Sequence, residues 1–344
     1  MRLTNRDAIV EHIQGLIETG ALPGAVFGVA TATEVIAVHA LGYRQLKPEA
    51  LPMTQDTTFD WASLTKVVAT TAITMRLLER GFFRLDDLVE RFVAGNFGSL
   101  GLSHLLTHTS GLPAWLDLAP YPKAAERIGA ISRASRLYSP GHQVLYSDLN
   151  YILLGYILEH VSGQALDRLF VSEVANPLGM TQTGFGPSDH RDIAATEWDA
   201  ETNQYVVGVV HDENARAAGG VSGHAGLFGT VADLLRFGQA ILNASSWLAP
   251  PTMASWLRAR TQGIPGELRA YGFQKPHPLS SAGDFMSPDA VGHTGFTGTS
   301  LWVDPHFGVA MVLLTNRVHL GRKSNAPIRL RPIFHNMVLA GLRP

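Results

Sequence analysis

The most informative stretch of this chain is Asp60-Trp61-Ala62-Ser63-Leu64-Thr65-Lys66-Val67-Val68, which places a nucleophile and a base three residues apart. On an α-helix, side chains at this spacing lie on one face, so the Lys66 amine can approach the Ser63 hydroxyl. Lysine activates a serine as a general base only when it is neutral, which requires its pKa to fall from about 10.4 through burial or a helix dipole. Alone, the pattern also fits an ordinary helix start with Ser63 near the N-cap.

Composition indicates a well-packed globular enzyme rather than a disordered or fibrous chain. The 344 residues are 46% hydrophobic and 16% charged, with 34 glycines and 19 prolines, which is enough for two domains or one large composite domain. The formal net charge is −2 and no Lys/Arg run stands out, so nucleic acid is not expected as a partner. The absence of cysteine excludes a thiol nucleophile, a disulfide scaffold and cysteine-ligated metal.

We expect no secretion signal within the N-terminal residues, because Asp7, Glu11 and His12 interrupt any apolar run that could form its core. No stretch reaches the roughly 18 apolar residues that would span a membrane. We therefore expect a cytoplasmic protein by default, or a periplasmic or secreted one if a leader has been removed.

The order of periodic segments predicts an α/β (α+β) fold with an antiparallel sheet built from both ends of the chain. A helix over 5–19 and a hairpin of strands 25–30 and 35–40 come first, and a loop follows to about residue 58. A second hairpin (299–303 and 309–314) and a helix over 328–342 close the chain. We expect residues 1–60 and 265–344 to form the sheet region flanked by the terminal helices. Residues 61–264, which include a helix over 63–80, would form an inserted, mostly helical region, with the active site in the cleft between the two parts.

Two further clusters complete a recognisable set. They are Tyr146-Ser147-Asp148 and His293-Thr294-Gly295-Phe296-Thr297-Gly298. With Ser63-x-x-Lys66 they resemble the three ordered motifs of the serine β-lactamase and penicillin-binding-protein superfamily: Ser-x-x-Lys, Tyr-x-Asn and Lys-Thr-Gly. The branch concerned holds class C β-lactamases, D,D-carboxypeptidases, D-aminopeptidases and related serine esterases. Segments 105–113, 223–230 and 233–237 add to the likeness, which runs from about Gly24 to Arg317 and implies the same sheet-plus-helices fold.

The resemblance implies a role for each matching residue. Ser63 would attack a substrate carbonyl, Lys66 would take part in its deprotonation, and Tyr146 would shuttle protons with Lys66. The backbone amides of Ser63 and Phe296 would form the oxyanion hole. The residues expected to contact substrate are Asp148, His293, Thr294 and Gly295.

Two residues depart from the family pattern. Asp148 stands where an asparagine is usual, and its carboxylate would favour a charged lysine or tether it in an ion pair. A shifted alternative, Ser147-Asp148 as the start of Ser-Asp-Asn, is less attractive because Leu149 fills the last position.

His293 replaces a lysine, so a permanent charge becomes a titrating one with a reference pKa of about 6.5. Recognition of a substrate carboxylate is then not expected from this position. Arg317 could supply the missing charge, but an exposed loop arginine without a partner is the favoured interpretation.

The sequence therefore predicts a serine hydrolase that forms an acyl-enzyme on Ser63 and acts on short-chain esters or on D-amino-acid amide or peptide bonds. A β-lactamase or D,D-carboxypeptidase is the first alternative, and a non-catalytic sensor that binds a peptide or a β-lactam is the second. No metal or organic cofactor is expected.

Other histidines offer weaker alternatives. His104 and His108 are four residues apart, as in some metal sites, but no glutamate of a His-Glu-x-x-His motif lies between them. His211-Asp212-Glu213 and His224 are interpreted as polar groups that line or support the cleft, with a substrate contact from His224 left open. An α/β-hydrolase is disfavoured because the chain has no Gly-x-Ser-x-Gly elbow.

Overall fold

A six-stranded antiparallel sheet organises the molecule, and both ends of the chain contribute to it. The computed structural model describes residues 1–187, 192–243 and 247–344. The strand order is β10-β11-β12-β2-β3-β4, and strand β12 near the C-terminus pairs directly with β2 near the N-terminus, with Met311 opposite Val29. The bounds of its strands are β2 Gly24–Ala30, β3 Val35–Gln45, β4 Leu51–Pro52, β10 Val291–Thr294, β11 Ser300–Asp304 and β12 Val309–Thr315.

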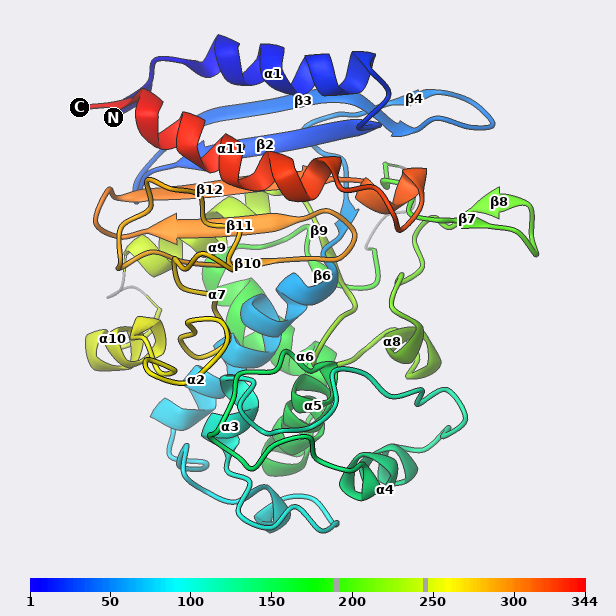
Figure 1. Ribbon diagram of the computed structural model, residues 1–344, viewed down its shortest axis with the longest axis vertical. Coiled ribbons are helices and arrows are strands. Elements are labelled where there is room, and N and C mark those ends of the chain that lie inside the picture. The colour runs from blue at the N-terminus through cyan, green and yellow to red at the C-terminus, as the bar shows by residue number, and fades with distance from the viewer. Residues whose placement is uncertain (188–191, 244–246) are drawn as a thin grey trace.

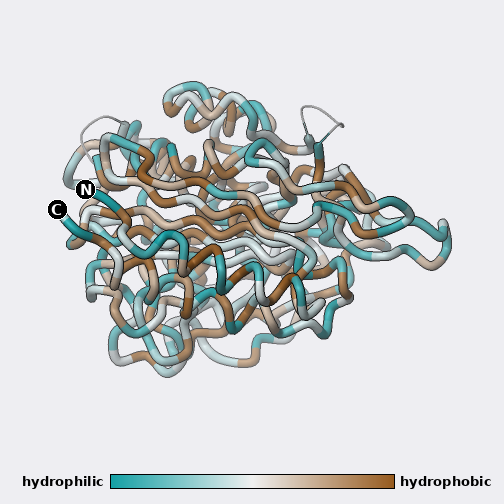
Figure 2. Tube along the Cα trace, turned by 90° about the horizontal axis from the view of Figure 1, so that it is seen from above, coloured by the Kyte–Doolittle hydropathy of each residue, from teal (hydrophilic) through white to brown (hydrophobic). Residues whose placement is uncertain are grey.

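Helices cover both faces of this sheet. The terminal helices α1 (Arg6–Glu18) and α11 (Ala326–Gly341) lie side by side on one face, and α9 (Val231–Leu242) lies on the other (Figure 1). Every residue of β2 and β12 is buried, which explains their nearly continuous apolar sequence. Gly28 allows α9 to approach closely, because a Cβ there would lie 2.7 Å from the Leu235 side chain. Figure 2 shows the apolar segments running through these central strands, between more polar outer loops.

A larger helical region packs beneath α9 and holds the second part of the core. Its buried centre is formed by α2 and α5, with the shorter helices around them (Figure 1). Its helices are α2 Ala72–Glu79, α3 Leu102–Leu106, α4 Ala124–Arg133, α5 Asp148–Ser162, α6 Leu166–Phe170, α7 Asn176–Leu178, α8 Glu213–Ala217 and α10 Pro250–Leu257. Short 3₁₀ turns span Ala62–Leu64, Val89–Arg91 and Arg317–Leu320, and π-helical turns span Lys66–Thr71 and Val171–Ala175.

Short strands connect the two regions and tie the chain ends together. Strands β5 (Phe59–Asp60), β9 (Leu227–Gly229) and β6 (Gly184–Phe185) form a small sheet in the order β5-β9-β6. The pair β7 (Trp198–Asp199) and β8 (Gln204–Tyr205) forms a projecting hairpin, and β1 (Arg2–Leu3) pairs with β13 (Leu342–Arg343). Strand β5 leads straight into Ser63, so this small sheet fixes where the Ser63 segment leaves the sheet region.

The predicted fold class is confirmed: an antiparallel sheet, terminal helices on it and a mostly helical region inserted between its strands. The helical segment expected over 63–80 is present, but it is not α-helical throughout. The chain makes a 3₁₀ turn, then a π-helical turn, and becomes α-helical only from Ala72. Strands β4 and β10 were not expected, because two and four residues are too few for a clear period-2 pattern.

Among the described residues, no helix has both the length and the apolar character needed to cross a membrane.

Candidate active site

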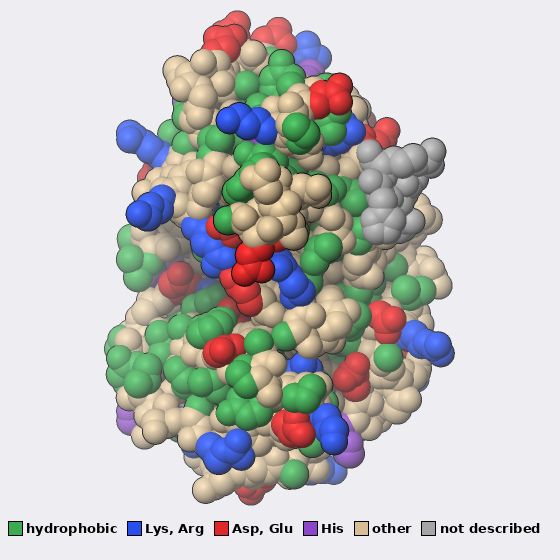
Figure 3. All heavy atoms as spheres, turned by 90° about the vertical axis from the view of Figure 1, so that its right-hand side faces the viewer, with side chains coloured by type: hydrophobic (Ala, Val, Ile, Leu, Met, Phe, Trp, Pro, Cys, Tyr) green, Lys and Arg blue, Asp and Glu red, His purple; other side chains and the backbone are tan. Residues whose placement is uncertain are grey.

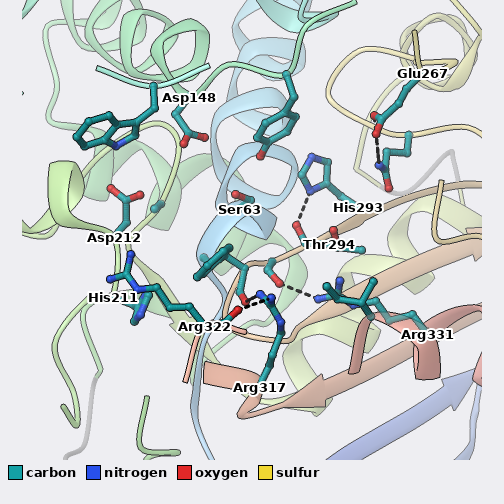
Figure 4. A pocket seen from close by; sticks show the side chains of 18 of the residues that line it. Ser63, Asp148, His211, Asp212, Glu267, His293, Thr294, Arg317, Arg322 and Arg331 are labelled. Carbon is teal, nitrogen blue, oxygen red and sulfur yellow. Dashed lines mark hydrogen bonds between the residues drawn. The ribbon is translucent and has the colours of Figure 1, made fainter. Parts of the chain in front are cut away.

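Ser63 opens onto a cleft between the sheet region and the helical region. The cleft has a volume of about 760 Å³. The three predicted motifs all reach it, and Figure 4 shows Ser63 at its centre with Asp148 on one side and His293 on the other. On the face seen in Figure 3, basic and acidic side chains gather around a hollow near the middle, which fits the mixture of arginines and carboxylates that line the cleft.

The backbone just before Ser63 is strained, and Asp60 supports it. Ala62 has φ +46°, a left-handed conformation that a residue with a Cβ rarely adopts. The Asp60 carboxylate accepts the amide of Ala62 at 2.8 Å and the amide of His211 at 2.7 Å. Burial raises the pKa of Asp60 above its ordinary value, although both amide contacts act in the opposite direction. Asp60 thus fixes the turn that presents Ser63 to the cleft.

Lys66 lies directly beneath Ser63, held by two hydrogen bonds and an ion pair. The Nζ atom is 2.9 Å from Ser63 Oγ, 2.8 Å from Asp148 Oδ1 and 3.1 Å from the backbone oxygen of His224. The side chain is 0% exposed. Burial alone would lower the pKa of Lys66, but the Asp148 carboxylate and the Tyr146 hydroxyl more than offset this and raise it.

Of the two sequence-based expectations for Lys66, the structure supports the charged, ion-paired lysine that Asp148 implies and contradicts the lowered pKa that a lysine base requires.

Tyr146 lines the cleft with its ring enclosed by other functional groups. The His108 imidazole stacks on it with ring centroids 4.4 Å apart. The Lys66 ammonium and the Arg269 guanidinium lie 5.0 and 5.2 Å from its centroid, at cation–π distance. Burial raises the pKa of the Tyr146 hydroxyl, while Lys66 and hydrogen bonds to Lys66 and Ser63 act against that shift. Tyr146 is thus a protonated phenol in contact with both Ser63 and Lys66.

His293, on β10, is neutral, and one of its ring nitrogens is buried without a hydrogen-bond partner among the described residues. It is 2% exposed, and its Nδ1 lies 2.8 Å from the carbonyl oxygen of Thr294. Because a carbonyl oxygen only accepts, Nδ1 carries the proton, and Nε2 is left as an acceptor without a partner among the described residues. Burial, followed by the charges of Arg269 and Lys66, holds the pKa of His293 well below its ordinary value. His293 therefore does not replace the positive charge of the lysine that is usual here.

The turn after β10 is held rigidly against the Ser63 segment. Gly295 is required there, because a Cβ would lie 2.4 Å from the backbone oxygen of Trp61. Arg331 binds the Gly295 carbonyl at 2.8 Å, and Arg317 binds the Phe296 carbonyl at 3.0 Å. With their carbonyls held from behind, the peptide groups around Phe296 keep a fixed orientation beside Ser63, as an oxyanion hole requires.

The structure brings the predicted site residues together in one place. The members that line the cleft are Ser63, Tyr146, Asp148, His293, Thr294, Gly295 and Phe296, with Lys66 buried beneath them. Ser147, the alternative member of the second motif, is buried away from the cleft, and its hydroxyl donates to the Pro113 carbonyl at 2.6 Å.

His104 and His108, the candidate metal pair, each use Nδ1 in a structural hydrogen bond. His104 Nδ1 accepts the amide of Gly101, and His108 Nδ1 accepts the amide of Ser147. In the part of the chain that the structure describes, no group of three or more His, Asp or Glu residues is arranged to hold a metal ion.

His211 and His224 support the cleft. The His211 ring stacks against Phe296 at 5.7 Å and contacts Glu197. The His224 ring is 1% exposed, so it does not face a substrate directly.

Arg317 is not the exposed loop arginine that the sequence favoured. It is 7% exposed, it donates to the carbonyls of Phe296, Arg322 and Ser324, and its guanidinium lies 4.8 Å from the Phe296 ring centroid.

Sequence reasoning also missed Asp60, Arg269 and Arg331, and it considered His108 only as a possible metal ligand. Of the three missed residues, only Asp60 had a signal, since it is three residues before Ser63 in the segment 60–68.

Comparisons with known proteins agree with this arrangement. A family model described as Beta-lactamase matches residues 9–331. A protein of Escherichia coli strain K12 named "Putative D-alanyl-D-alanine carboxypeptidase" is 32% identical over 320 aligned positions, which cover 80% of this chain and 72% of that protein. A protein of the same name from Salmonella typhimurium is 30% identical over 380 aligned positions, covering 96% of this chain and 86% of that protein.

Solved structures share the fold. A penicillin-binding-protein homologue from Caulobacter crescentus superposes with a TM-score of 0.78 at 20% identity, covering 99% of both chains. The hydrolase EstCE1 gives a TM-score of 0.76 at 24% identity, covering 96% of this chain and 98% of that one. The family match and the names of the relatives indicate a hydrolase of the serine β-lactamase and penicillin-binding-protein type. With its three motifs gathered in one cleft and the family model matched over nearly its whole length, this chain belongs to the beta-lactamase family.

Proposed function

We propose that this protein is a serine hydrolase that works through a covalent acyl-enzyme on Ser63 and prefers esters or amides without a carboxylate next to the scissile bond. The observation that carries the proposal is the 2.9 Å contact between Ser63 Oγ and Lys66 Nζ at the floor of an open cleft. Acyl transfer needs a nucleophile within hydrogen-bond reach of a proton carrier, and a third group that orients the carrier. Here these groups are Ser63, Lys66 and Asp148.

Acylation requires an acceptor for the Ser63 proton, and Asp148 is the group that makes this possible. Lys66 first gives one of its protons to Asp148, and the neutral amine then takes the proton of Ser63 as Oγ bonds to the substrate carbonyl carbon. The lysine is an ammonium again after this step, and the negative charge has moved from Asp148 to the carbonyl oxygen, where the amides of Ser63 and Phe296 stabilise it. Tyr146 then delivers a proton to the leaving group and is reprotonated through Lys66. Hydrolysis of the acyl-enzyme repeats these steps with water as the nucleophile.

The preference against a substrate carboxylate follows from the partners that the positively charged side chains of the cleft already bind. Arg317 and Arg331 bind backbone carbonyls, Arg322 pairs with Glu197 and Glu213, and Arg269 pairs with Glu267. His293 is neutral, and Lys66 is paired with Asp148. A substrate carboxylate would have to compete with existing partners for each of these charges.

The names of the relatives support a second candidate, hydrolysis of a D-alanyl-D-alanine bond. This reaction uses the same acyl-enzyme chemistry but a substrate that ends in a carboxylate. The two candidates therefore differ in the leaving group and not in the roles of Ser63 and Lys66.

Steady-state turnover of three substrates separates these candidates. We expect measurable hydrolysis of p-nitrophenyl butyrate, with kcat/KM at least about tenfold above that for benzylpenicillin or for diacetyl-L-lysyl-D-alanyl-D-alanine. Faster release of D-alanine from the peptide would favour the second candidate. A single stoichiometric acylation by benzylpenicillin, with no turnover of any substrate, would instead indicate a sensor.

Replacing Asp148 by the asparagine usual in the family tests the proton route. In Asp148→Asn the carboxylate that raises the Lys66 pKa is lost, and burial then lowers that pKa. We expect kcat/KM for the ester to rise with pH through the Lys66 ionisation in this variant, because neutral lysine becomes the base. Wild-type kcat/KM should show no such alkaline ionisation up to about pH 10. Identical pH profiles for the two proteins would contradict a role for Asp148 in proton transfer.

A further inference from the structure

One carboxylate at the edge of the cleft stands apart from the others in its partners. Asp148 pairs with Lys66, Glu213 with Arg322 and Glu267 with Arg269. Asp212, among the residues that the structure describes, makes no ion pair with a lysine or an arginine. Its negative charge therefore faces the cleft without a permanent positive partner.

Asp212 is nevertheless firmly held. Its Oδ1 atom accepts the His224 Nε2–H at 2.6 Å and the backbone amide of Ala215 at 2.8 Å, and the buried His224 ring is fixed in turn by Ser222 at 2.8 Å. Both contacts to the carboxylate end on its Oδ1 atom, and the third joins Ser222 to His224. The side chain is 21% exposed and lines the cleft. Burial alone would raise the pKa of Asp212, but the His224 contact outweighs burial and holds this pKa well below the usual range.

The surroundings of Asp212 suit a positively charged group. Figure 4 shows Asp212 and Asp148 on the same side of Ser63, with their carboxylates turned toward one another. Trp115, which is half exposed, also lines the cleft and offers an aromatic surface of the kind that binds ammonium groups.

A second, independent observation points to a ligand rich in hydrogen-bond donors. His293, across the cleft from Asp212, presents a buried acceptor nitrogen without a partner, and the arginines of the cleft are already engaged. The lysine that His293 replaces is expected to bind a substrate carboxylate, which belongs to the leaving group of a D-alanyl-D-alanine substrate. We therefore place the leaving group at His293 and the acyl portion on the side of Asp212 and Asp148.

We propose that Asp212 is the recognition group for an ammonium on the acyl portion of the substrate, so that the preferred substrates are amides or esters of an amino acid with a free α-amino group. This inference rests on the proposed function, because it identifies the substrate class of the same site. His224 acts as a positioning residue: it orients Asp212 with its ring and binds Lys66 through its carbonyl.

Two substrates that differ only in the ammonium test the inference. They are D-alanine p-nitroanilide and N-acetyl-D-alanine p-nitroanilide, which share a scissile bond and a neutral leaving group. In Asp212→Asn we expect kcat/KM for the free amine to fall at least about tenfold, mainly through KM, because a charge-assisted contact is lost, while the acetylated substrate changes by less than about twofold. Equal losses on both substrates, or no loss on either, would overturn the inference.

Glu213→Gln is the matched control. Glu213 is the adjacent carboxylate in the same cleft, but Arg322 already binds it, so its removal should leave the ratio between the two anilides unchanged. Asparagine at position 212 can still cap helix α8, so the variant should fold, which thermal melting checks.

A binding measurement separates this inference from the proposed function. Calorimetry with D-alaninamide compares Ser63→Ala with the double variant Ser63→Ala/Asp212→Asn, neither of which needs to turn over. We expect binding to the first, and a Kd at least about tenfold weaker for the second. Equal Kd values, or no binding to Ser63→Ala, would reject the ammonium site even if ester hydrolysis depends on Ser63. The expected difference in Kd, combined with ester hydrolysis that survives in Ser63→Ala, would keep the ammonium site and reject the acyl-enzyme.

Discussion

Ser63→Ala is expected to lower kcat for p-nitrophenyl butyrate by about 10³-fold or more, because it removes the hydroxyl on which the proposed acyl-enzyme forms. The fold should be unaffected. Ser63 is half-buried at the cleft, its hydroxyl contacts Lys66 and Tyr146, and alanine is compatible with the 3₁₀ turn that carries it. The measurements are initial rates and circular-dichroism melting on the same preparations.

A serine elsewhere in the chain provides the control. Ser172 is exposed in the π-helical turn Val171–Ala175, and its hydroxyl donates only to the Leu169 carbonyl. Ser172→Ala should retain wild-type turnover. Mass spectrometry after quenching with the ester should find an acylated peptide that contains Ser63 in wild type and none in Ser63→Ala. Wild-type rates in Ser63→Ala would refute the mechanism.

The parts of the site that could be predicted from the sequence are those that local spacing or motif order encodes. Ser63 and Lys66 are separated by three residues, and they meet even though the helix that carries them is not a regular α-helix. Tyr146 and His293 come from motifs whose order along the chain is informative. The sheet was predictable because each of its main hairpins is formed by segments adjacent in sequence, with turns that break the apolar pattern.

The remaining features depend on contacts between residues far apart in the chain. Arg269 lies over Tyr146 and His108 stacks on it, but no pattern in the sequence relates these three positions. The sequence also could not show that Arg317 turns inward, because that depends on three backbone carbonyls brought together by the folded turns around it. The Asp148 substitution did indicate a charged Lys66, but the balance between burial and the carboxylate depends on how close Asp148 lies, which only the folded structure gives.

The second large effect is expected for Lys66→Ala, which should lose both activity and stability. Without the lysine, the Ser63 proton has no route to Asp148, so kcat should fall by about 10²- to 10⁴-fold. The variant also leaves Asp148 and the His224 carbonyl without their buried partner. Removing one member of a buried ion pair costs about 3–5 kcal/mol, and the 20% exposure of Asp148 to the cleft places the expected loss toward the lower end of that range.

Two further variants separate the loss of activity from the loss of stability. In Lys66→Ala/Asp148→Asn the unpaired charge is removed as well, so most of the lost unfolding free energy, measured by urea denaturation, should return while turnover remains absent. Lys275 is a second buried lysine, bound to the carbonyls of Leu257 and Asp289 and absent from the cleft lining. Lys275→Ala should therefore be destabilised yet keep its turnover per folded molecule. If Lys275→Ala lost ester hydrolysis as completely as Lys66→Ala, impaired folding would explain both results, and the 2.9 Å contact between Lys66 and Ser63 would carry no catalytic meaning.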